Sequence, residues 1–193
     1  MSKELEIEFK NMVTKEEFYR MMKEFNILSR DFIEQQNYYF DTPEFDIKGH
    51  HSALRIRRKN DKYELTLKQP AKDGNWETNE KMEEKAALSM IKTGLIPEGE
   101  IKTSLKMSNI SVENIICFGS LTTKRVEIPY QDGLLVFDNS FYLNKEDFEI
   151  EYEVKDKKMG EQHFLRLMDR LQIPIRSTDN KIIRFYREYK KLQ

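Results

Sequence analysis

The sequence predicts an α+β domain in which a β-sheet closes into a barrel with a polar interior and helices on its outside. Three observations predict this fold. Several segments alternate charged and apolar residues, which is the two-residue period of a β-strand. The charges are sorted by sign, because some of these segments carry carboxylates while others carry arginine and lysine. Other segments have apolar residues at helical spacing, and such amphipathic helices can cover the apolar faces of the strands.

The first elements can be assigned in chain order. Residues 4–10 alternate strictly between charged and apolar side chains, which predicts a strand with one charged face. Thr14 then begins a helix, and Glu17 completes a capping box with it. The elements expected next are a strand at 33–41, a hairpin at 53–68 that turns at Asn60-Asp61, a turn at 72–75, a strand near 76–80, a helix at 82–93 ended by Gly94, and a short helix after Pro97.

The second half of the chain continues with strands and ends in helices. Arg125 and Glu127 share one face of the strand expected at 121–130. The dipeptide Asp132-Gly133 is typical of a hairpin turn. The remaining elements expected are strands at 134–138 and 148–155 and amphipathic helices at about 160–171 and 179–190.

Size and composition suit a single domain, which we expect to span residues 1–193. Of the 193 residues, 38% are hydrophobic, which is enough for a sizeable core. A formal net charge of −1 gives the whole molecule no attraction for nucleic acid or an anionic membrane. The single cysteine, Cys117, cannot form an internal disulfide, which fits a reducing compartment. Without a signal-like segment or an apolar run of membrane-spanning length, we expect a cytoplasmic protein.

The first and last charged strands share one pattern. Residues 4–10 and 149–155 both carry three glutamates and a final lysine, separated by apolar or aromatic residues. Such a strand usually turns its charged face to water. However, three like charges about 7 Å apart on one face repel each other unless they are compensated, and glutamate is a poor strand former. Other strands carry the compensating sign, at Arg55, Arg57, Lys68 and Arg125.

A closed sheet that turns these faces inward would bring carboxylates and cations together. Burying so many charges costs free energy unless ligands complete the network. Clustered carboxylates suit hard divalent cations, and clustered arginine and lysine suit phosphoryl oxygens. Together they predict a polyphosphate bound with a metal ion. The chain has seven glycines and no Walker motif, so side chains must hold the phosphates.

At this point the residues resemble those of the CYTH proteins, the triphosphate tunnel metalloenzymes. Glu6-Ile7-Glu8-Phe9-Lys10 is similar to the ExExK signature of that family. The later blocks that resemble the family, in its order, are Tyr39-Phe40-Asp41-Thr42-Pro43, Ala53-Leu54-Arg55-Ile56-Arg57, Leu65-Thr66-Leu67-Lys68, Glu80, Arg125, Asp138, Phe148-Glu149-Ile150-Glu151, and Lys181 with Arg184. The resemblance covers nearly the whole chain, and the length suits a stand-alone bacterial-type member.

The resemblance implies an eight-stranded antiparallel barrel, open as a tunnel, with a divalent metal ion and a triphosphate inside. The metal ligands that it implies are Glu6, Glu8, Glu149 and Glu151, with Asp138 and Glu80 assisting; Glu153 extends the acidic ladder and joins the candidates. The phosphate-binding residues that it implies are Lys10, Arg55, Arg57, Lys68, Arg125, Lys181 and Arg184. The expected ion is Mg²⁺ or Mn²⁺.

The expected activity is metal-dependent hydrolysis of a small-molecule triphosphate, with inorganic triphosphate as the first candidate substrate. Lys68, crowded by other cations, is the candidate general base, and Tyr39 is a candidate helper. Three alternatives stay open: thiamine triphosphatase, a class IV-type adenylate cyclase acting on a nucleoside triphosphate, and a non-catalytic module that binds polyphosphate or nucleotide. All use the same triphosphate-binding residues, so these residues do not distinguish them. From the near-neutral net charge we expect no nucleic-acid or membrane partner. The oligomeric state stays unassigned.

Overall fold

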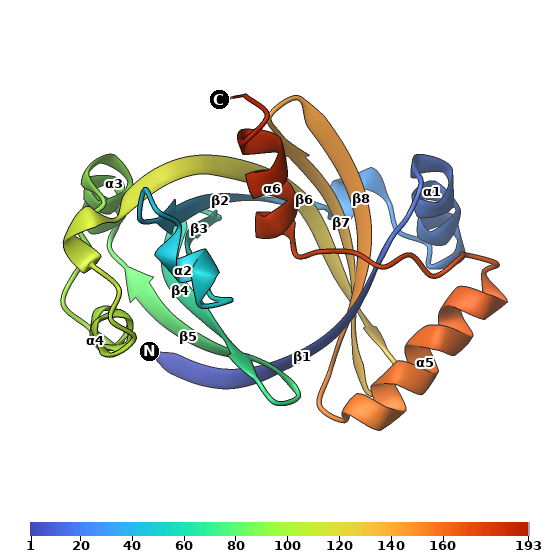
Figure 1. The fold of residues 1–193 in the computed structure, drawn as a ribbon. Coiled ribbons are helices and arrows are strands. Elements are labelled where there is room, and N and C mark those ends of the chain that lie inside the picture. Colours follow the sequence, from blue (N-terminus) through green and yellow to red (C-terminus); the bar gives the residue numbers. More distant parts are fainter. Residues whose placement is uncertain (193) are drawn as a thin grey trace. The chain divides into compact units, whose positions relative to one another are not determined.

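The computed structural model, which describes residues 1–192, is a closed β-barrel with the strand order β1-β5-β4-β3-β2-β6-β7-β8 (Figure 1). Helices lie between and after the strands, so the predicted α+β barrel is confirmed. The strands are β1 (Ser2–Met12), β2 (Ile33–Asp41), β3 (Ala53–Lys59), β4 (Lys62–Ala71), β5 (Gly74–Met82), β6 (Ile116–Tyr130), β7 (Gly133–Tyr142) and β8 (Lys145–Val154). The helices are α1 (Lys15–Glu24), α2 (Asp46–Gly49), α3 (Glu84–Thr93), α4 (Glu100–Met107), α5 (Lys157–Arg170) and α6 (Lys181–Tyr189), with 3-10 turns η1 (Ser29–Asp31) and η2 (Val112–Asn114).

The chain forms two compact units. Unit 1 consists of Met1–Leu5 and Gln35–Leu121, and unit 2 consists of Glu6–Glu34 and the chain from Thr122 onward. Each unit buries its own apolar core between the outer faces of its strands and its helices. The expectation of a single domain over residues 1–193 stays a prediction. Within residues 1–192, no helix is both long enough and apolar enough to cross a membrane.

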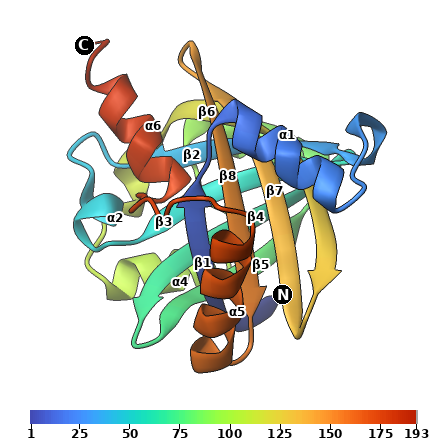
Figure 2. The same ribbon diagram turned by 90° about the vertical axis from the view of Figure 1, so that its right-hand side faces the viewer.

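In unit 2, α1 and α5 pack against the outer face of β8 (Figure 2). The predicted capping box at the start of α1 is present: the Glu17 amide donates to the Thr14 hydroxyl, and the Thr14 amide donates to the Glu17 carboxylate. The apolar residues of the helices meet those of β7 and β8 in one core. Its fully buried members include Met21, Leu135, Phe137, Ile150, Tyr152, Leu167 and Met168.

In unit 1, α2 packs on β3, α3 on β4, and α4 on β5. The predicted outward residues of the hairpin are buried in this core, including Leu54, Ile56, Leu65 and Leu67. Gly94 ends α3 in the left-handed region at φ 74°. A Cβ atom there would lie 1.7 Å from the carbonyl oxygen of Ile115, so the end of α3 requires glycine.

The hairpin turns set the register of the strands. Asn60 and Asp61 both have positive φ, at 49° and 56°, which confirms the predicted turn between β3 and β4. The turn predicted at Asp132-Gly133 is wrong by one residue, because Tyr130 pairs with Gly133 and the turn is therefore made by Gln131 and Asp132. Gly133 is instead required by packing, since a Cβ atom there would lie 2.4 Å from the carbonyl oxygen of Glu153.

Candidate functional site

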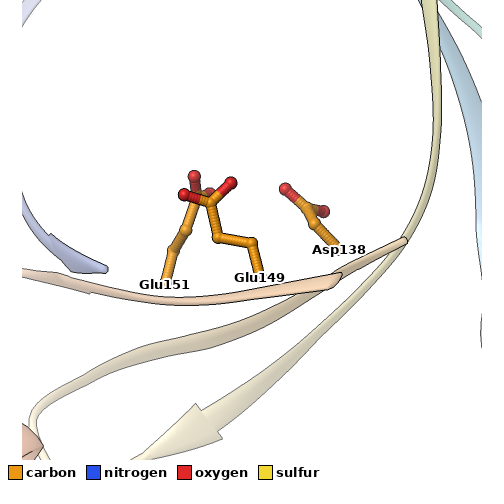
Figure 3. Close-up of side chains that lie close together, drawn as sticks. All are labelled: Asp138, Glu149 and Glu151. Atoms are coloured by element: carbon orange, nitrogen blue, oxygen red, sulfur yellow. The ribbon is translucent and has the colours of Figure 1, made fainter. Parts of the chain in front are cut away.

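Three acidic side chains of unit 2 converge on the inner face of β7 and β8. Asp138 pairs with Glu149 across the two strands, and Glu151 follows Glu149 by two residues on the same face. One oxygen of each carboxylate lies within 4.8 Å of the others, and all three residues are buried. Figure 3 shows the three carboxyl groups turned to the same side of the sheet. We name these residues the acidic triad.

Lys181, the first residue of α6, places its ammonium group among the triad. Its Nζ lies 2.8 Å from Asp138 Oδ2, 2.5 Å from Glu149 Oε2 and 2.6 Å from Glu151 Oε1. Burial by itself lowers the pKa of Lys181, but the three carboxylates outweigh it and raise that pKa well above its ordinary value. Lys181 is therefore a permanent cation in this arrangement.

Arg125 holds the triad from the neighbouring strand. It pairs with Asp138 across β6 and β7, and its Nε and one terminal nitrogen contact the two oxygens of Asp138 at 2.7 and 2.6 Å. The same terminal nitrogen donates to Glu151 at 2.7 Å. Burial raises the pKa of Asp138, but Arg125 and Lys181 outweigh this effect and keep it below its ordinary value. A bidentate pair of this kind fixes both partners.

The N-terminal part of α6 is tied to β8 at a second point. Arg184, one helical turn after Lys181, donates to both oxygens of Glu149 at 3.0 and 3.3 Å and to Asp147 at 3.0 Å. Lys10 on β1 donates to the side chain of Asn180, the residue that precedes α6, at 2.6 Å. Figure 1 shows α6 beside the end of β7 and β8. Basic residues from β1 and α6 thus lie near the acidic triad: Arg184 contacts Glu149, and the charge of Lys10 acts on Glu151.

The remaining predicted ligands of unit 2 form an acidic ladder next to the triad. Glu8 and Glu153 are direct partners across β1 and β8, and Glu8 also contacts the ammonium group of Lys10. Burial, together with the charges of Glu6, Glu151 and Glu8, raises the pKa of Glu153 to about 7, against the opposing effect of Arg125. Glu6 belongs to this ladder because its negative charge acts on Glu153. The structure therefore brings Asp138, Glu149 and Glu151 together and sets the other three at their side.

Unit 1 carries a cluster of the opposite sign on the inner face of β3, β4 and β5. Lys68 pairs with Glu77 across β4 and β5, and their charged groups meet at 2.6 Å. A terminal nitrogen of Arg55 lies 3.7 Å from the same Glu77 oxygen. Arg57, on the same face, donates to Asn37 at 3.1 Å. Burial raises the pKa of Glu77, but Lys68, Arg55 and Arg57 outweigh it and lower that pKa to about 2.

Two predicted catalytic residues belong to this cationic cluster. Tyr39 pairs with Arg55 across β2 and β3, is buried, and stacks on Phe118 with ring centroids 6.3 Å apart. Lys68 has the carboxylate of Glu77 as its partner, and a carboxylate at that distance stabilises the charged ammonium form. This contact works against the deprotonated form that a general base requires.

Glu80, predicted to assist in metal binding, lies outside both clusters. It pairs with Leu65, so it occupies the opposite face of β5 from Glu77. Its carboxylate accepts a hydrogen bond from the backbone N–H of Ile101 at 3.0 Å, in the first turn of α4. A negative charge at the start of a helix interacts favourably with the helix dipole. Sequence reasoning missed Glu77. The length of the turn could have revealed it: a two-residue turn at Lys72 and Asp73 places residue 77 directly opposite residue 68 on the neighbouring strand.

Comparison with known proteins identifies similar chains. The family model of the CYTH domain matches residues 4–186. A protein from Bacillus subtilis (strain 168), provisionally named triphosphatase YjbK, is 48% identical over 191 residues, which cover 99% of each chain.

Solved structures show the same fold. A Bacillus halodurans protein provisionally described as an adenylate cyclase has 38% identity and a TM-score of 0.93, with 96% of this chain and 100% of that chain covered. HpAC1 from Hippeastrum, provisionally described as an adenylyl cyclase and reported to have a dominant triphosphatase activity, has 21% identity and a TM-score of 0.79. That match covers 95% of this chain and 96% of that one, and at this identity it shows the fold alone.

Proposed function

The chain belongs to the CYTH domain family, and from this premise we propose that it hydrolyses a small-molecule triphosphate with the help of a divalent metal ion. The observation that carries the proposal is the acidic triad, because three buried carboxylates converge on one point beside several cations. A pure anion-binding site gains nothing from carboxylates. The relative that is 48% identical and provisionally named a triphosphatase supports the same activity.

The donor set of the triad fits a hard divalent cation such as Mg²⁺ or Mn²⁺, which prefers carboxylate oxygens. Asp138, Glu149 and Glu151 would hold the ion, with Glu6, Glu8 and Glu153 at their side. When bound, the ion would neutralise charge on the phosphoryl oxygens and so favour attack on phosphorus. Glu80 has no part in this proposal, because its carboxylate serves the start of α4.

The cations of the chain would bind the phosphoryl oxygens. In unit 2 the candidates are Lys10, Arg125, Lys181 and Arg184; in unit 1 they are Arg55, Arg57 and Lys68. Arginine and lysine at these positions would donate to the negatively charged phosphoryl oxygens and so hold the triphosphate. Lys68 would act as a charged donor to phosphate, because Glu77 stabilises its ammonium form, and Tyr39 stays a candidate for orienting the substrate.

The test is release of phosphate from inorganic triphosphate, thiamine triphosphate and ATP, each with Mg²⁺, with Mn²⁺ and without metal. We expect metal-dependent release from at least one of them, with inorganic triphosphate turned over fastest. Glu149→Gln should lower the release by at least about 100-fold. Glu113→Gln, at an exposed position on η2, is the matched control and should leave it unchanged.

Two results would replace the proposal. The relative from Bacillus halodurans is provisionally described as an adenylate cyclase, so cyclic AMP is measured in the ATP samples. Formation of cyclic AMP and pyrophosphate would establish a cyclase instead of a hydrolase. Triphosphate binding of equal strength with and without metal, combined with no turnover, would establish a non-catalytic binding module.

A further inference from the structure

The ammonium group of Lys181 occupies the point where the oxygens of the acidic triad converge. It contacts Asp138, Glu149 and Glu151 at 2.5 to 2.8 Å. These are the three residues whose oxygens could hold one metal ion. A divalent ion of the size of Mg²⁺ needs carboxylate oxygens at about 2.1 Å. Both cations would use the same oxygens, so they cannot occupy the triad together.

The charge of the site leads to the same conclusion. Three carboxylates of the triad face three cations of the chain, which are Lys181, Arg125 and Arg184. Arg184 also contacts Asp147, and Arg125 lies 3.8 Å from Glu153. The oxygens of the triad are therefore already paired with cations of the chain. A divalent ion added while all three cations stay in place would be repelled by them at short range in a buried site, which is costly. One of the chain's cations must therefore withdraw when the ion binds.

Lys181 is the cation best placed to withdraw. Arg125 sits in the middle of β6 and makes a bidentate contact with Asp138, so its planar group is fixed by strand and partner. Lys181 stands at the first position of a nine-residue helix, after residues 171–180, which belong to no helix or strand. Its ammonium is a point charge on a flexible stem, and it can rotate away without moving the sheet.

We propose that Lys181 is a resident counter-ion of the acidic triad, and that a divalent metal ion binds there by displacing its ammonium group. The inference rests on the metal site of the proposed function but not on hydrolysis. In the metal-free chain, Lys181 closes the site and ties α6 to β8. On metal binding, the ammonium leaves the triad, and a bound triphosphate supplies a new anionic partner for it. Metal and triphosphate then assist each other's binding.

The first experiment measures Mn²⁺ binding to the full chain, by the electron paramagnetic resonance signal of the unbound ion. Lys181→Met keeps the length of the stem and removes the competing charge, so we expect Mn²⁺ to bind at least about tenfold more tightly than to the wild type. Lys145→Met is the matched control, because Lys145 is exposed and lies 3.9 Å from Glu188, and its affinity should equal that of the wild type.

The second experiment needs no variant and therefore does not depend on whether Lys181→Met folds. An amine-acetylating reagent is applied to the wild-type chain with and without Mn²⁺, and the modified lysines are quantified by peptide mass spectrometry. Displacement of Lys181 by the ion should raise its acetylation at least about twofold, as expected when a buried amine loses its ion pairs. Acetylation of Lys145 should stay constant.

The proposal is overturned if Lys181→Met binds Mn²⁺ with unchanged or lower affinity, if neither chain binds it, or if Mn²⁺ binds without changing the acetylation of Lys181. Hydrolysis is assayed separately by phosphate release. Displacement of Lys181 without any triphosphatase activity would refute the proposed function and leave the exchange standing. Triphosphatase activity without displacement of Lys181 would refute the exchange and leave the proposed function standing.

Discussion

The two units solve the same electrostatic problem with opposite signs. In unit 1, one carboxylate, Glu77, lies among the cations Arg55 and Lys68. In unit 2, one ammonium group, that of Lys181, lies among three carboxylates. Each cluster holds a resident charge of the other sign among its like charges, because like charges gathered without a partner would destabilise the fold. In unit 2, Arg125 and Arg184 also contact the carboxylates from the side.

The two resident charges differ in the kind of element that holds them. Glu77 is held in the β4–β5 hairpin, directly opposite Lys68. Lys181 stands at the start of α6, after a segment without regular structure. A ligand of the cationic cluster must therefore bind beside Glu77, whereas a ligand of the acidic triad can replace Lys181. The comparison predicts one permanent counter-charge and one exchangeable counter-charge.

The largest effect is expected from removing the fixed cation of unit 2. Arg125→Met removes the bidentate partner of Asp138 and one of the two cations on Glu151, and breaking such a buried network costs about 3–5 kcal/mol of unfolding free energy. Urea unfolding of the metal-free protein measures it. Arg58→Met is the control, because that arginine is exposed and pairs with the exposed Asp61, and its loss should cost less than about 1 kcal/mol. Equal costs would mean that Arg125 does not hold the triad.

Removing one carboxylate of the triad should affect activity most. We expect Glu149→Gln to lower kcat/KM for inorganic triphosphate by at least about 100-fold, because it removes a metal ligand and part of the network that stabilises the reacting charge. A steady-state phosphate-release assay measures the change, with Glu113→Gln alongside. A fall of less than tenfold at saturating metal would place the ion elsewhere.

The resident carboxylate of unit 1, Glu77, should make the free energy of unfolding depend on pH. The pKa of Glu77 is lowered to about 2 in the folded chain, from an ordinary 4.5. A lowered folded pKa contributes stability above pH 4.5, and this contribution is lost as the pH falls from 4.5 through 2. Its full size is about 3 kcal/mol. Urea unfolding at pH 6 and pH 3 should show a smaller acid-induced loss in Glu77→Gln than in the wild type. Parallel losses in the two chains would contradict the role of Glu77.

The smallest effect is expected from Lys68. As a charged donor held by Glu77, it would bind substrate and transition state alike, so Lys68→Met should lower kcat/KM by about tenfold, mainly through KM. Lys62→Met, at an exposed position on the same strand, should change neither constant. A loss confined to kcat, with KM unchanged, would instead restore Lys68 as the general base.

Much of this architecture could be predicted from the sequence. Strict alternation identified the charged strands and their faces, and spacing by two residues placed Glu149 and Glu151 on one face. The capping box at Thr14 and the glycine that ends α3 are local signals, and both are confirmed. Such features depend on neighbours in sequence, so periodicity and helix-end chemistry are enough to find them.

The remaining features depend on register and on tertiary placement. Glu80 was predicted by resemblance and Glu77 was missed. The two residues are three positions apart on β5, an odd number, so their side chains lie on opposite faces of the sheet. The turn after Tyr130 was shifted because Gly133 serves a close approach to Glu153 and not the turn itself. Lys181 was predicted to bind phosphate. Its three contacts follow from the position of α6, which no local pattern in residues 171–180 determines.

The most direct test is a crystal structure of the protein with Mn²⁺ and a non-hydrolysable triphosphate analogue, in which anomalous scattering locates the metal. We expect a manganese peak among the oxygens of Asp138, Glu149 and Glu151. We also expect Lys181 to have left these oxygens while Glu77 still contacts Lys68. Manganese bound away from the triad, with the Lys181 ammonium still in contact with all three carboxylates, would contradict it.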